Sequence, residues 1–433
     1  MVAMSVAALA AGGMLGSALA MQGPAKISLS SASGHHHRMM NGHGMMSGQH
    51  SSMGSGSKSM GGSGWRHEPM RAGRMMNGWS FTTLDNPADP TFNQLLGISN
   101  RSVLAGYFGS GAQGHPNKGY VASLQGQQAA FRNENVPGSV QTQVVGLNDL
   151  GVTVGFWSNQ NNANEMNSNF GFYASHGRFH TVNFPTMHNS TPPVNQLLGV
   201  NDAGTAVGFY TNTDGVNFGY KYSIPRHSFQ RVVLPKSVRG SLGPSLTAAG
   251  INNRGDVAGF FTPHGSNSTF AFLQLANGAS YKLAYPGAAM TQAFGINDRD
   301  EVVGAYTVGS GNNAMSYGFT WRPGRGFRSV SDPQGPGATT VNGVNDAGQL
   351  VGFYTDGAGN THGMLVMPMH HQMATPMQPT PSMSPSMMTT PPMGTQSASP
   401  TPSTPAMQTT PAMPTTPAMP ASSAPPTNAG HHF

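Results

Sequence analysis

Short runs of Val, Ile, Leu, Phe and Tyr alternate with clusters of Gly, Asn, Asp and Ser through the middle of the chain, over residues 81–366. The apolar residues follow a period of two over short segments, and no apolar stripe with the 3.6-residue period of a helix accompanies them. This pattern is typical of short strands joined by tight turns. The sequence therefore predicts an all-β region.

The middle region repeats itself six times at intervals of 45 to 53 residues, each time with a Gly-x-Asn triplet. The triplets begin at Gly97 (as Gly-Ile-Ser-Asn, one residue longer than the others), Gly146, Gly199, Gly250, Gly295 and Gly343. A period near fifty residues indicates an array of supersecondary units. In the second repeat we expect strands over 143–148, 152–157, 170–174 and 178–184. Four antiparallel strands repeated six times predict a six-bladed β-propeller.

The turn after the first strand of a repeat reads Asn-Asp-x-Gly, as in residues 201–204. Asn and Asp side chains bond to their own backbone two residues on, and Gly supplies a positive φ without steric cost. The sequence thus predicts a tight hairpin turn. The second strand then reads Val-Gly-Phe-Tyr (residues 207–210), which places a bare Gly beside large rings and lets the faces of neighbouring blades interlock.

The two ends of the repeat region complement each other. The sixth repeat has strand patterns over 341–345, 350–354 and 362–366 but no fourth strand. The first strand-like stretch of the region, WSFTTLDNP (residues 79–87), resembles the fourth strand of other repeats, such as FHTVNFP (residues 179–185). We therefore predict that the segment near Trp79 pairs with the segment near Leu365 and closes the ring, which leaves no unpaired inner edge.

The flanking segments have different compositions. Residues 1–20 are apolar, uncharged from Val2 onward and end in Ala-Leu-Ala, which indicates a signal peptide; the alternative is a membrane anchor, for which this run is short and contains three Gly and two Ser. Residues 21–78 are rich in Met, Gly, Ser and His, and residues 367–433 in Pro, Thr, Met, Ser and Ala, so we expect both to be disordered. The propeller is assigned to 79–366, in a secreted, extracellular or periplasmic protein without disulfides, since cysteine is absent.

The formal net charge of +6 is carried mostly outside the repeats. Residues 1–80 hold six basic residues and one acidic residue, whereas residues 81–366 hold 15 basic and 14 acidic residues. The repeat region is therefore nearly neutral, and it lacks the basic stripe that a nucleic-acid partner requires. No second apolar segment follows that could span a membrane after the signal peptide is removed.

The phrase Gly-Ile-Asn-Asp-x-Gly-x-x-Val-Gly-x-Tyr, followed by an aromatic strand and a strand that ends before Pro-Gly, resembles the bacterial HAF family of extracellular repeats. The best matches are Gly295–Tyr306 and Gly343–Tyr354. The His-Ala-Phe triplet is incomplete here, with Ala271-Phe272 and His362-Gly363 each keeping part of it. The resemblance implies secretion and a β-rich repeat domain, and it brings no catalytic residues.

The N-terminal segment holds the densest candidate metal ligands of the chain. Imidazoles suit Cu(II), Ni(II) or Zn(II), and thioethers suit Cu(I). The candidate copper ligands are His35, His36, His37, Met39, Met40, His43, Met45 and Met46. The alternative interpretation is a low-complexity segment in which Met is a filler.

Other motifs in the repeats favour loops over ligand sites. GSGAQG (residues 109–114) matches a dinucleotide fingerprint but leads into a strand instead of a helix. TNTDG (211–215) and TDGAGN (355–360) offer one Asp each, whereas calcium needs six or more oxygens. Three histidines are predicted in loops at one rim: His115, His188 and His264.

The loops of one rim vary in length and composition, while the Asn-Asp-x-Gly turns are short and uniform. Variable loops on a rigid scaffold are typical of recognition. The sequence therefore favours a non-catalytic binding or structural module, with a glycan or cell-envelope polymer as partner on the variable rim, and with no cofactor. One alternative is an envelope copper-binding protein that uses the His/Met-rich segment. The other is a polysaccharide hydrolase or lyase, because a propeller brings distant carboxylates together.

Overall fold

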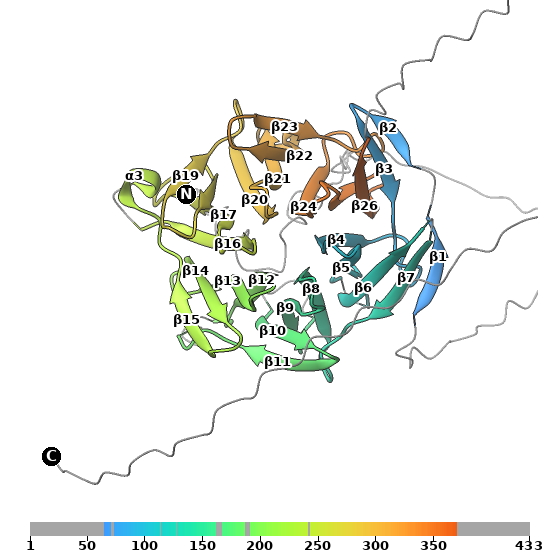
Figure 1. Cartoon of the computed structure of the whole chain (residues 1–433), viewed down its shortest axis with the longest axis horizontal. Coiled ribbons are helices and arrows are strands. Elements are labelled where there is room, and N and C mark those ends of the chain that lie inside the picture. The colour runs from blue at the N-terminus through green and yellow to red at the C-terminus, as the bar shows by residue number, and fades with distance from the viewer. Residues whose placement is uncertain are drawn as a thin grey trace, which may run out of the picture. The chain divides into compact units, whose positions relative to one another are not determined.

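Six antiparallel sheets surround a central axis as the blades of a propeller (Figure 1). The computed structural model describes residues 65–70, 73–112, 114–126, 128–161, 167–186, 191–240 and 243–369. In this part of the chain each blade has four repeat strands, called a to d from the axis outward, and two of the blades carry a fifth strand on the outside. The prediction of a six-bladed β-propeller is confirmed.

The strands follow one order in every blade, and blades 1 to 6 are numbered along the chain. Strands a are β4 (Asn93–Ile98), β8 (Gln141–Leu147), β12 (Asn195–Val200), β16 (Ser245–Ile251), β20 (Met290–Ile296) and β24 (Thr339–Val344). Strands b are β5 (Val103–Phe108), β9 (Thr153–Ser158), β13 (Thr205–Thr211), β17 (Val257–Thr262), β21 (Val302–Val308) and β25 (Leu350–Thr355). Strands c are β6 (Lys118–Gln125), β10 (Phe170–Ser175), β14 (Asn217–Ser223), β18 (Phe270–Gln274), β22 (Met315–Arg322) and β26 (Thr361–Pro368). Strands d are β7 (Gln128–Asn133), β11 (Arg178–Val182), β15 (Ser228–Arg231), β19 (Ser280–Leu283), β23 (Gly326–Val330) and β3 (Trp79–Thr83).

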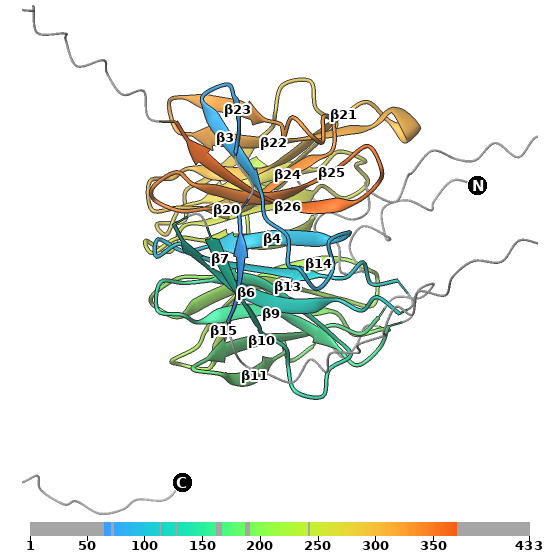
Figure 2. The same cartoon turned by 90° about the vertical axis from the view of Figure 1, so that its right-hand side faces the viewer.

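The ring closes by the predicted pairing of the two ends of the repeat region. Strand β3 is antiparallel to β26, with Thr82 opposite Leu365, and the two lie side by side in Figure 2. Blade 6 is thus built from both ends of the repeat region. Closure in this way pairs the outer edge of β26, which the sixth repeat by itself would leave free.

Two short strands precede the ring. Strand β1 (Arg66–Pro69) pairs with β7 on the outside of blade 1, and β2 (Arg74–Met76) pairs with β3 on the outside of blade 6. Both lie inside residues 21–78, for which the sequence predicts disorder, so that prediction is wrong for these two strands. Their sequences have no period-two apolar pattern, because an outermost strand buries little of its surface.

The Gly of strand b is required by the shape of strand a. Every strand a carries a β-bulge, for example between Leu197 and Gly199. A Cβ on Gly208 would overlap the carbonyl oxygen of Gln196, and the equivalent Gly of the other five blades faces the equivalent carbonyl. The Val-Gly-Phe phrase therefore exists because strand b passes the bulged strand too closely for any side chain.

The Gly of the Gly-x-Asn triplet forms a second steric constraint, this time between blades. A Cβ on each of the six glycines would lie 3.0–3.3 Å from the Cα of the corresponding glycine in the next blade. The relation runs around the whole circle, from Gly97 to Gly146 and finally from Gly343 back to Gly97. Strands a therefore approach one another closely at the axis, which tightens the inner end of the ring.

The core consists of layers between adjacent blades. Successive side chains of a strand point to opposite faces of its blade and so fill the two interfaces with the neighbouring blades. The large fully buried rings include Tyr120, Phe172, Tyr220 and Phe319. The short helix α3 (Lys236–Arg239) and the 3-10 turn η2 (Gly311–Asn313) lie in connecting loops. Among the described residues, no helix has the length and apolar character that crossing a membrane requires.

Candidate functional site

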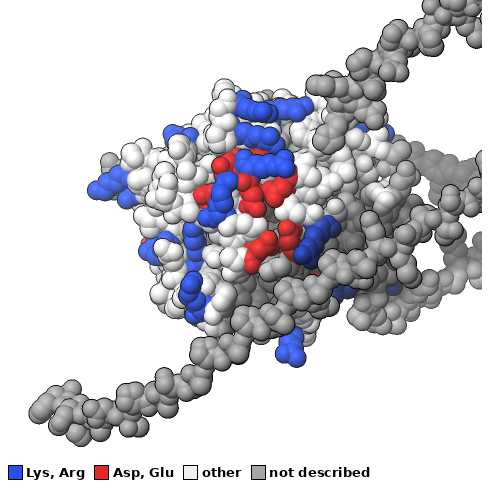
Figure 3. All heavy atoms as spheres, in the orientation of Figure 1, with Lys and Arg blue, Asp and Glu red and all other residues white. Residues whose placement is uncertain are grey.

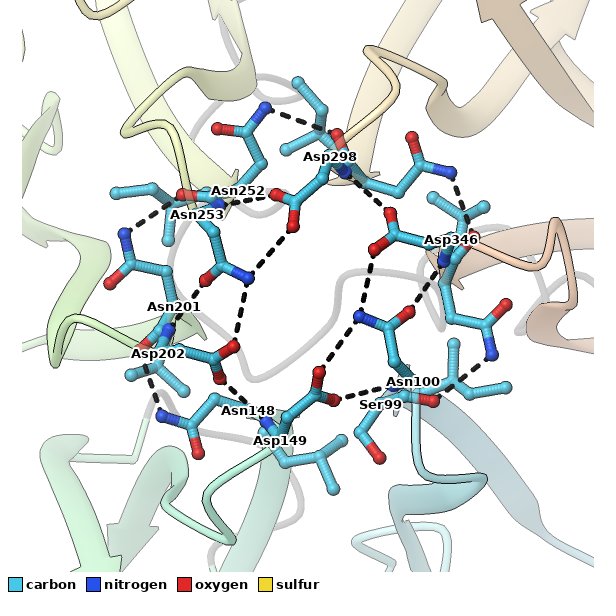
Figure 4. A pocket seen from close by; sticks show the side chains of 18 residues that line it. Ser99, Asn100, Asn148, Asp149, Asn201, Asp202, Asn252, Asn253, Asp298 and Asp346 are labelled. Carbon is cyan, nitrogen blue, oxygen red and sulfur yellow. Dashed lines mark hydrogen bonds between the residues drawn. The ribbon is translucent and has the colours of Figure 1, made fainter. Parts of the chain in front are cut away.

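The Asn-Asp step of the repeat builds a closed ring around the axis, on the face of the a–b turns (Figure 4). At the Asp position of each blade, the backbone N–H donates to the Oδ1 of the same position in the next blade, at 2.7–2.9 Å. The six members are Asn100, Asp149, Asp202, Asn253, Asp298 and Asp346. The Asp is thus an inter-blade acceptor, and the prediction that it bonds to its own turn is wrong.

The preceding Asn acts both within its own turn and between blades. In blade 2, the Asn148 Oδ1 accepts the N–H of Leu150, two residues on, at 3.1 Å, as predicted for this turn. In blade 3, the Asn201 Oδ1 accepts the N–H of Thr205, four residues on, at 2.9 Å. Its Nδ2 donates to the Asn252 carbonyl of the next blade at 3.0 Å. The same inter-blade bond occurs at five of the six junctions, at 2.9–3.2 Å.

The inter-blade bonds of these Asn side chains form a second ring around the axis, and the first repeat interrupts it. Ser99 occupies the Asn position, where its Oγ accepts the N–H groups of Arg101 and Val103, and it has no amide to donate to blade 2. Asn100 then occupies the Asp position. The first triplet is therefore not one residue longer, as its sequence suggests, but carries a substitution at each of the two positions.

The ring surrounds a cavity of about 70 Å³ and carries four carboxylates. Acidic side chains gather at the centre of the face shown in Figure 3. Asn100 donates from Nδ2 to Asp149 and Asp346, and Asn253 donates to Asp202 and Asp298, all at 2.9–3.0 Å. Both oxygens of all four carboxylates therefore accept hydrogen bonds, which suits a role in joining the blades.

The candidate copper ligands His35, His36, His37, Met39, Met40, His43, Met45 and Met46 lie outside the described residues, as does His188. His115 and His264 are exposed in the b–c loops of blades 1 and 4, so the fold places them in loops as predicted and does not bring them together. In the described part of the chain, no group of three or more His, Asp or Glu side chains is arranged to hold a metal ion.

The two motifs that resemble calcium-binding loops, residues 211–215 and 355–360, form turns. Asn212 Oδ1 accepts the N–H groups of Asp214 and Val216, and Asp356 Oδ1 accepts those of Ala358 and Asn360. GSGAQG lies in the b–c loop of blade 1 between β5 and β6, and no helix follows it. These motifs are loops, as the sequence indicates.

The opposite rim, where the b–c and d–a loops emerge, carries a second repeated arrangement that we call the rim cluster. In each blade it contains the residue before the loop Pro, the aromatic near the end of strand b, the residue opposite that aromatic on strand c, and a residue near the end of strand d. In blades 1 to 3 the members are Asn86, Phe108, Lys118 and Asn133; Val136, Trp157, Phe170 and Thr181; and Phe184, Tyr210, Phe218 and Arg231. In blades 4 to 6 they are Leu234, Phe261, Phe270 and Lys282; Tyr285, Tyr306, Tyr317 and Ser329; and Asp332, Tyr354, His362 and Thr83.

The rim clusters of blades 3 and 5 contain stacked aromatic rings, and that of blade 4 contains a tilted pair, Phe261 and Phe270. In blade 3, Phe184 stacks on Tyr210 with centroids 4.3 Å apart, and the guanidinium of Arg231 lies 4.4 Å above the ring of Phe218. In blade 4, the Lys282 ammonium lies 3.4 Å above the ring of Phe270. The strand c member is half-buried in all six blades, so each cluster presents one partly exposed side chain at the rim.

The rim cluster of blade 6 is polar. Tyr354 donates or accepts a 2.8 Å hydrogen bond with Thr83, and its ring lies 5.2 Å from that of His362. His362 lies between two carboxylates, with Nδ1 2.8 Å from Asp85 and Nε2 3.2 Å from Asp356. These bonds join β26 to the residue that follows the closing strand β3.

Burial, hydrogen bonds and neighbouring charges shift the pKa values of side chains in and beside this cluster. The hydrogen bond to Asp85 raises the pKa of His362, with the charges of Asp85 and Asp356 adding to the effect. Burial raises the pKa of Asp332, which is 1% exposed and has an Oδ2 without a hydrogen-bond partner in the described residues. Burial opposes ionisation of Asp356, but hydrogen bonds from Asn360, His362 and Ala358 lower its pKa to about 2.

Sequence reasoning missed the rim clusters. When the six repeats are aligned on strand c, Lys118 and His362 occupy a position that is aromatic in the other four repeats. That alignment requires the register between strands b and c, and the sequence does not give this register because the b–c loops vary in length.

No family model matches this chain, and no curated protein matches it. Among solved structures, a gluconolactonase from Xanthomonas campestris is similar at 11% identity, over 70% of this chain and 96% of its own, with a TM-score of 0.38. An ulvan lyase is similar at 12% identity over 71% and 94%, with a TM-score of 0.38. A fucose-binding lectin from Aleuria aurantia is similar at 10% identity over 55% and 78%, with a TM-score of 0.34. Likenesses at this level give the chain no activity.

Proposed function

We propose that this protein is a secreted, non-catalytic β-propeller of the HAF repeat type, and that it binds a glycan or cell-envelope polymer through its b–c/d–a rim. Export is inferred from the apolar segment before residue 21. The Pro/Thr-rich segment after residue 366 suits an extended spacer between the propeller and its surroundings.

The observation that carries the proposal is the variation at one structural position. The half-buried residues of strand c that pair with the strand b aromatic stand at the same place in every blade and differ in chemistry: Lys118, Phe170, Phe218, Phe270, Tyr317 and His362. On the opposite face, the ring of Asn and Asp side chains repeats almost unchanged. A rigid base with a chemically varied rim is how a scaffold supports recognition.

Partly exposed aromatic rings suit a carbohydrate ligand. A ring such as Tyr317 buries a large flat apolar area, and its hydroxyl stays available at the edge. Sugars offer the matching surfaces, because their C–H faces are apolar and their rims carry hydroxyl groups. Asn- and Ser-rich b–c loops next to these rings add hydrogen-bonding groups.

The bonding of the carboxylates supports a non-catalytic role. In the axial ring, Asp149, Asp202, Asp298 and Asp346 have both oxygens engaged. In the rim cluster of blade 6, Asp85 and Asp356 are bonded to His362 and to backbone N–H groups. A general base or nucleophile must reach a substrate, and these groups are committed to holding the fold.

The test is a glycan and envelope-polymer binding screen with the full-length secreted protein and two rim variants, Phe170→Ala and Tyr317→Ala. Leu150→Ala is the matched control, because Leu150 is exposed on the a–b turn face. We expect each rim variant to bind about tenfold more weakly, with unchanged binding by the control. A single cooperative thermal unfolding transition in each variant, at a lowered midpoint for the two rim variants, shows that the proteins are folded. Failure to bind any polymer would overturn the proposal, and release of sugar products would overturn its non-catalytic part.

A further inference from the structure

Four basic side chains lie along the rim of blades 3 and 4. Arg231 lies at the end of β15 and Lys282 near the end of β19, while Lys236 and Arg239 lie on α3, in the loop between these blades. Helix α3 lies next to β19, the strand that carries Lys282. Basic side chains lie over α3 at the left edge of Figure 3.

The fold holds two of these charges in fixed places. Arg231 lies over Phe218, and Lys282 lies over Phe270, at the same repeat position of adjacent blades. An aromatic face attracts a cation and limits its movement, so each charge is partly ordered before a ligand arrives. Within the described residues, Arg231, Lys236 and Lys282 have no ion pair with an acidic side chain.

The rim carries charges of both signs although the repeat region is nearly neutral. Asp214 lies in the b–c loop of blade 3, whereas Asp85, Asp89 and Asp356 lie, together with the basic Lys118, around the junction of blades 6 and 1. In a ring of six blades this junction is opposite the junction of blades 3 and 4, as Figure 1 shows for α3 and β4. A ligand responds to the local charge of the surface it meets and not to the net charge of the domain.

We infer that the ligand of the rim is a polysaccharide that bears carboxylate groups, and that it binds across the junction of blades 3 and 4; this rests on the proposed function. The guanidinium of Arg231 can bind a carboxylate through two parallel hydrogen bonds, and Lys282 and Lys236 act as point charges. Two aromatic–cation pairs on adjacent blades match a polymer in which charged sugars recur along the chain.

The experiment compares polygalacturonate with its fully methyl-esterified form, in which each carboxylate is a neutral methyl ester, on the full-length protein. We expect binding of polygalacturonate that weakens as salt is raised and little binding of the ester. The double variant Arg231→Ala/Lys282→Ala should lose about tenfold in affinity. The control Arg226→Ala/Arg325→Ala removes the same charge from exposed c–d turns on the opposite face and should bind like the parent protein.

Each alternative result has a separate meaning. Equal binding of the two polymers, or equal losses in both double variants, would overturn the inference. Equally tight binding of a DNA oligonucleotide would also overturn it, since it would indicate a general polyanion surface. Binding of neutral glycans alone would overturn this inference and leave the proposed function standing, whereas binding of no glycan would overturn both.

Discussion

His362 Nδ1 lies 2.8 Å from the carboxylate of Asp85, a residue 277 positions earlier in the chain. Asp85 lies just after the closing strand β3, and His362 lies near the start of β26. The pair therefore joins the two ends of the repeat region. Asp85 also accepts the N–H of Gly363 at 2.9 Å through its other oxygen. The last blade is thus secured by a side-chain bond in addition to the strand pairing.

The pair makes the stability of the ring dependent on pH. The hydrogen bond to Asp85 raises the pKa of His362, so its contribution is complete below the unfolded value of about 6.5 and is lost as pH rises through the folded-state pKa. At pH 5 we expect His362→Gln to lower the free energy of unfolding by about 1.5–3 kcal/mol. The difference should shrink at alkaline pH. Denaturant titrations at a series of pH values measure it.

His115→Gln is the control for this measurement, because His115 is an exposed loop histidine. Its unfolding free energy should match that of the parent protein at each pH. A loss in His362→Gln that stays constant from pH 5 to alkaline pH would contradict the expected ion pair.

Asp332 should reduce the stability of the folded protein at neutral pH. Burial raises the pKa of this carboxyl, so the folded state favours its protonated form, and stability falls as pH rises through the folded-state pKa. The same position is Leu in blade 4, which suggests Asp332→Leu as a test. We expect the variant to gain in unfolding free energy relative to the parent as pH is raised from 4 to 8. Asp332→Asn, which keeps the shape without the charge, should change in the same direction, and parallel pH curves would contradict this account.

Gly208 cannot accept a side chain. Because its Cβ would overlap the Gln196 carbonyl oxygen, Gly208→Ala must displace strand b from strand a. We expect a loss at or above the upper end of the usual 1–3 kcal/mol for overpacking, roughly 3 kcal/mol, measured by denaturant unfolding. Gly357→Ala is the matched control, since a Cβ there meets no atom within 4 Å and its loss should be small. Similar losses in the two variants would refute the steric explanation.

Ser99→Asn should complete the second ring of inter-blade bonds. An Asn at this position can donate to the Asn148 carbonyl, as Asn201 does to Asn252. We expect a gain of about 0.5–1.5 kcal/mol in unfolding free energy, the usual net value of one hydrogen bond. The converse variant, Asn201→Ser, should lose a similar amount. If Ser99→Asn destabilises the protein while Asn201→Ser is neutral, the amide bonds do not join the blades.

Local patterns were sufficient for the architecture. Six blades were predicted from period-two apolar runs and from the repeated Asn-Asp-x-Gly turns. Ring closure was predicted from the match between residues 79–87 and strands d such as 179–185. These features can be read from the sequence because they depend on neighbouring residues or on repetition. The same reasoning failed for β1 and β2, which pair through backbone groups at the outside of blades and need no apolar pattern.

The sequence by itself determined the number of blades, the strands in each and the way the ring closes, since these follow from periodicity and turn chemistry. Only the tertiary structure decided what the repeated side chains do. Asp149 bonds to the backbone of another blade, and His362 meets Asp85 across 277 positions. Such contacts depend on how closely the blades approach and on the register between strands, and neither quantity is written in any local stretch of the chain.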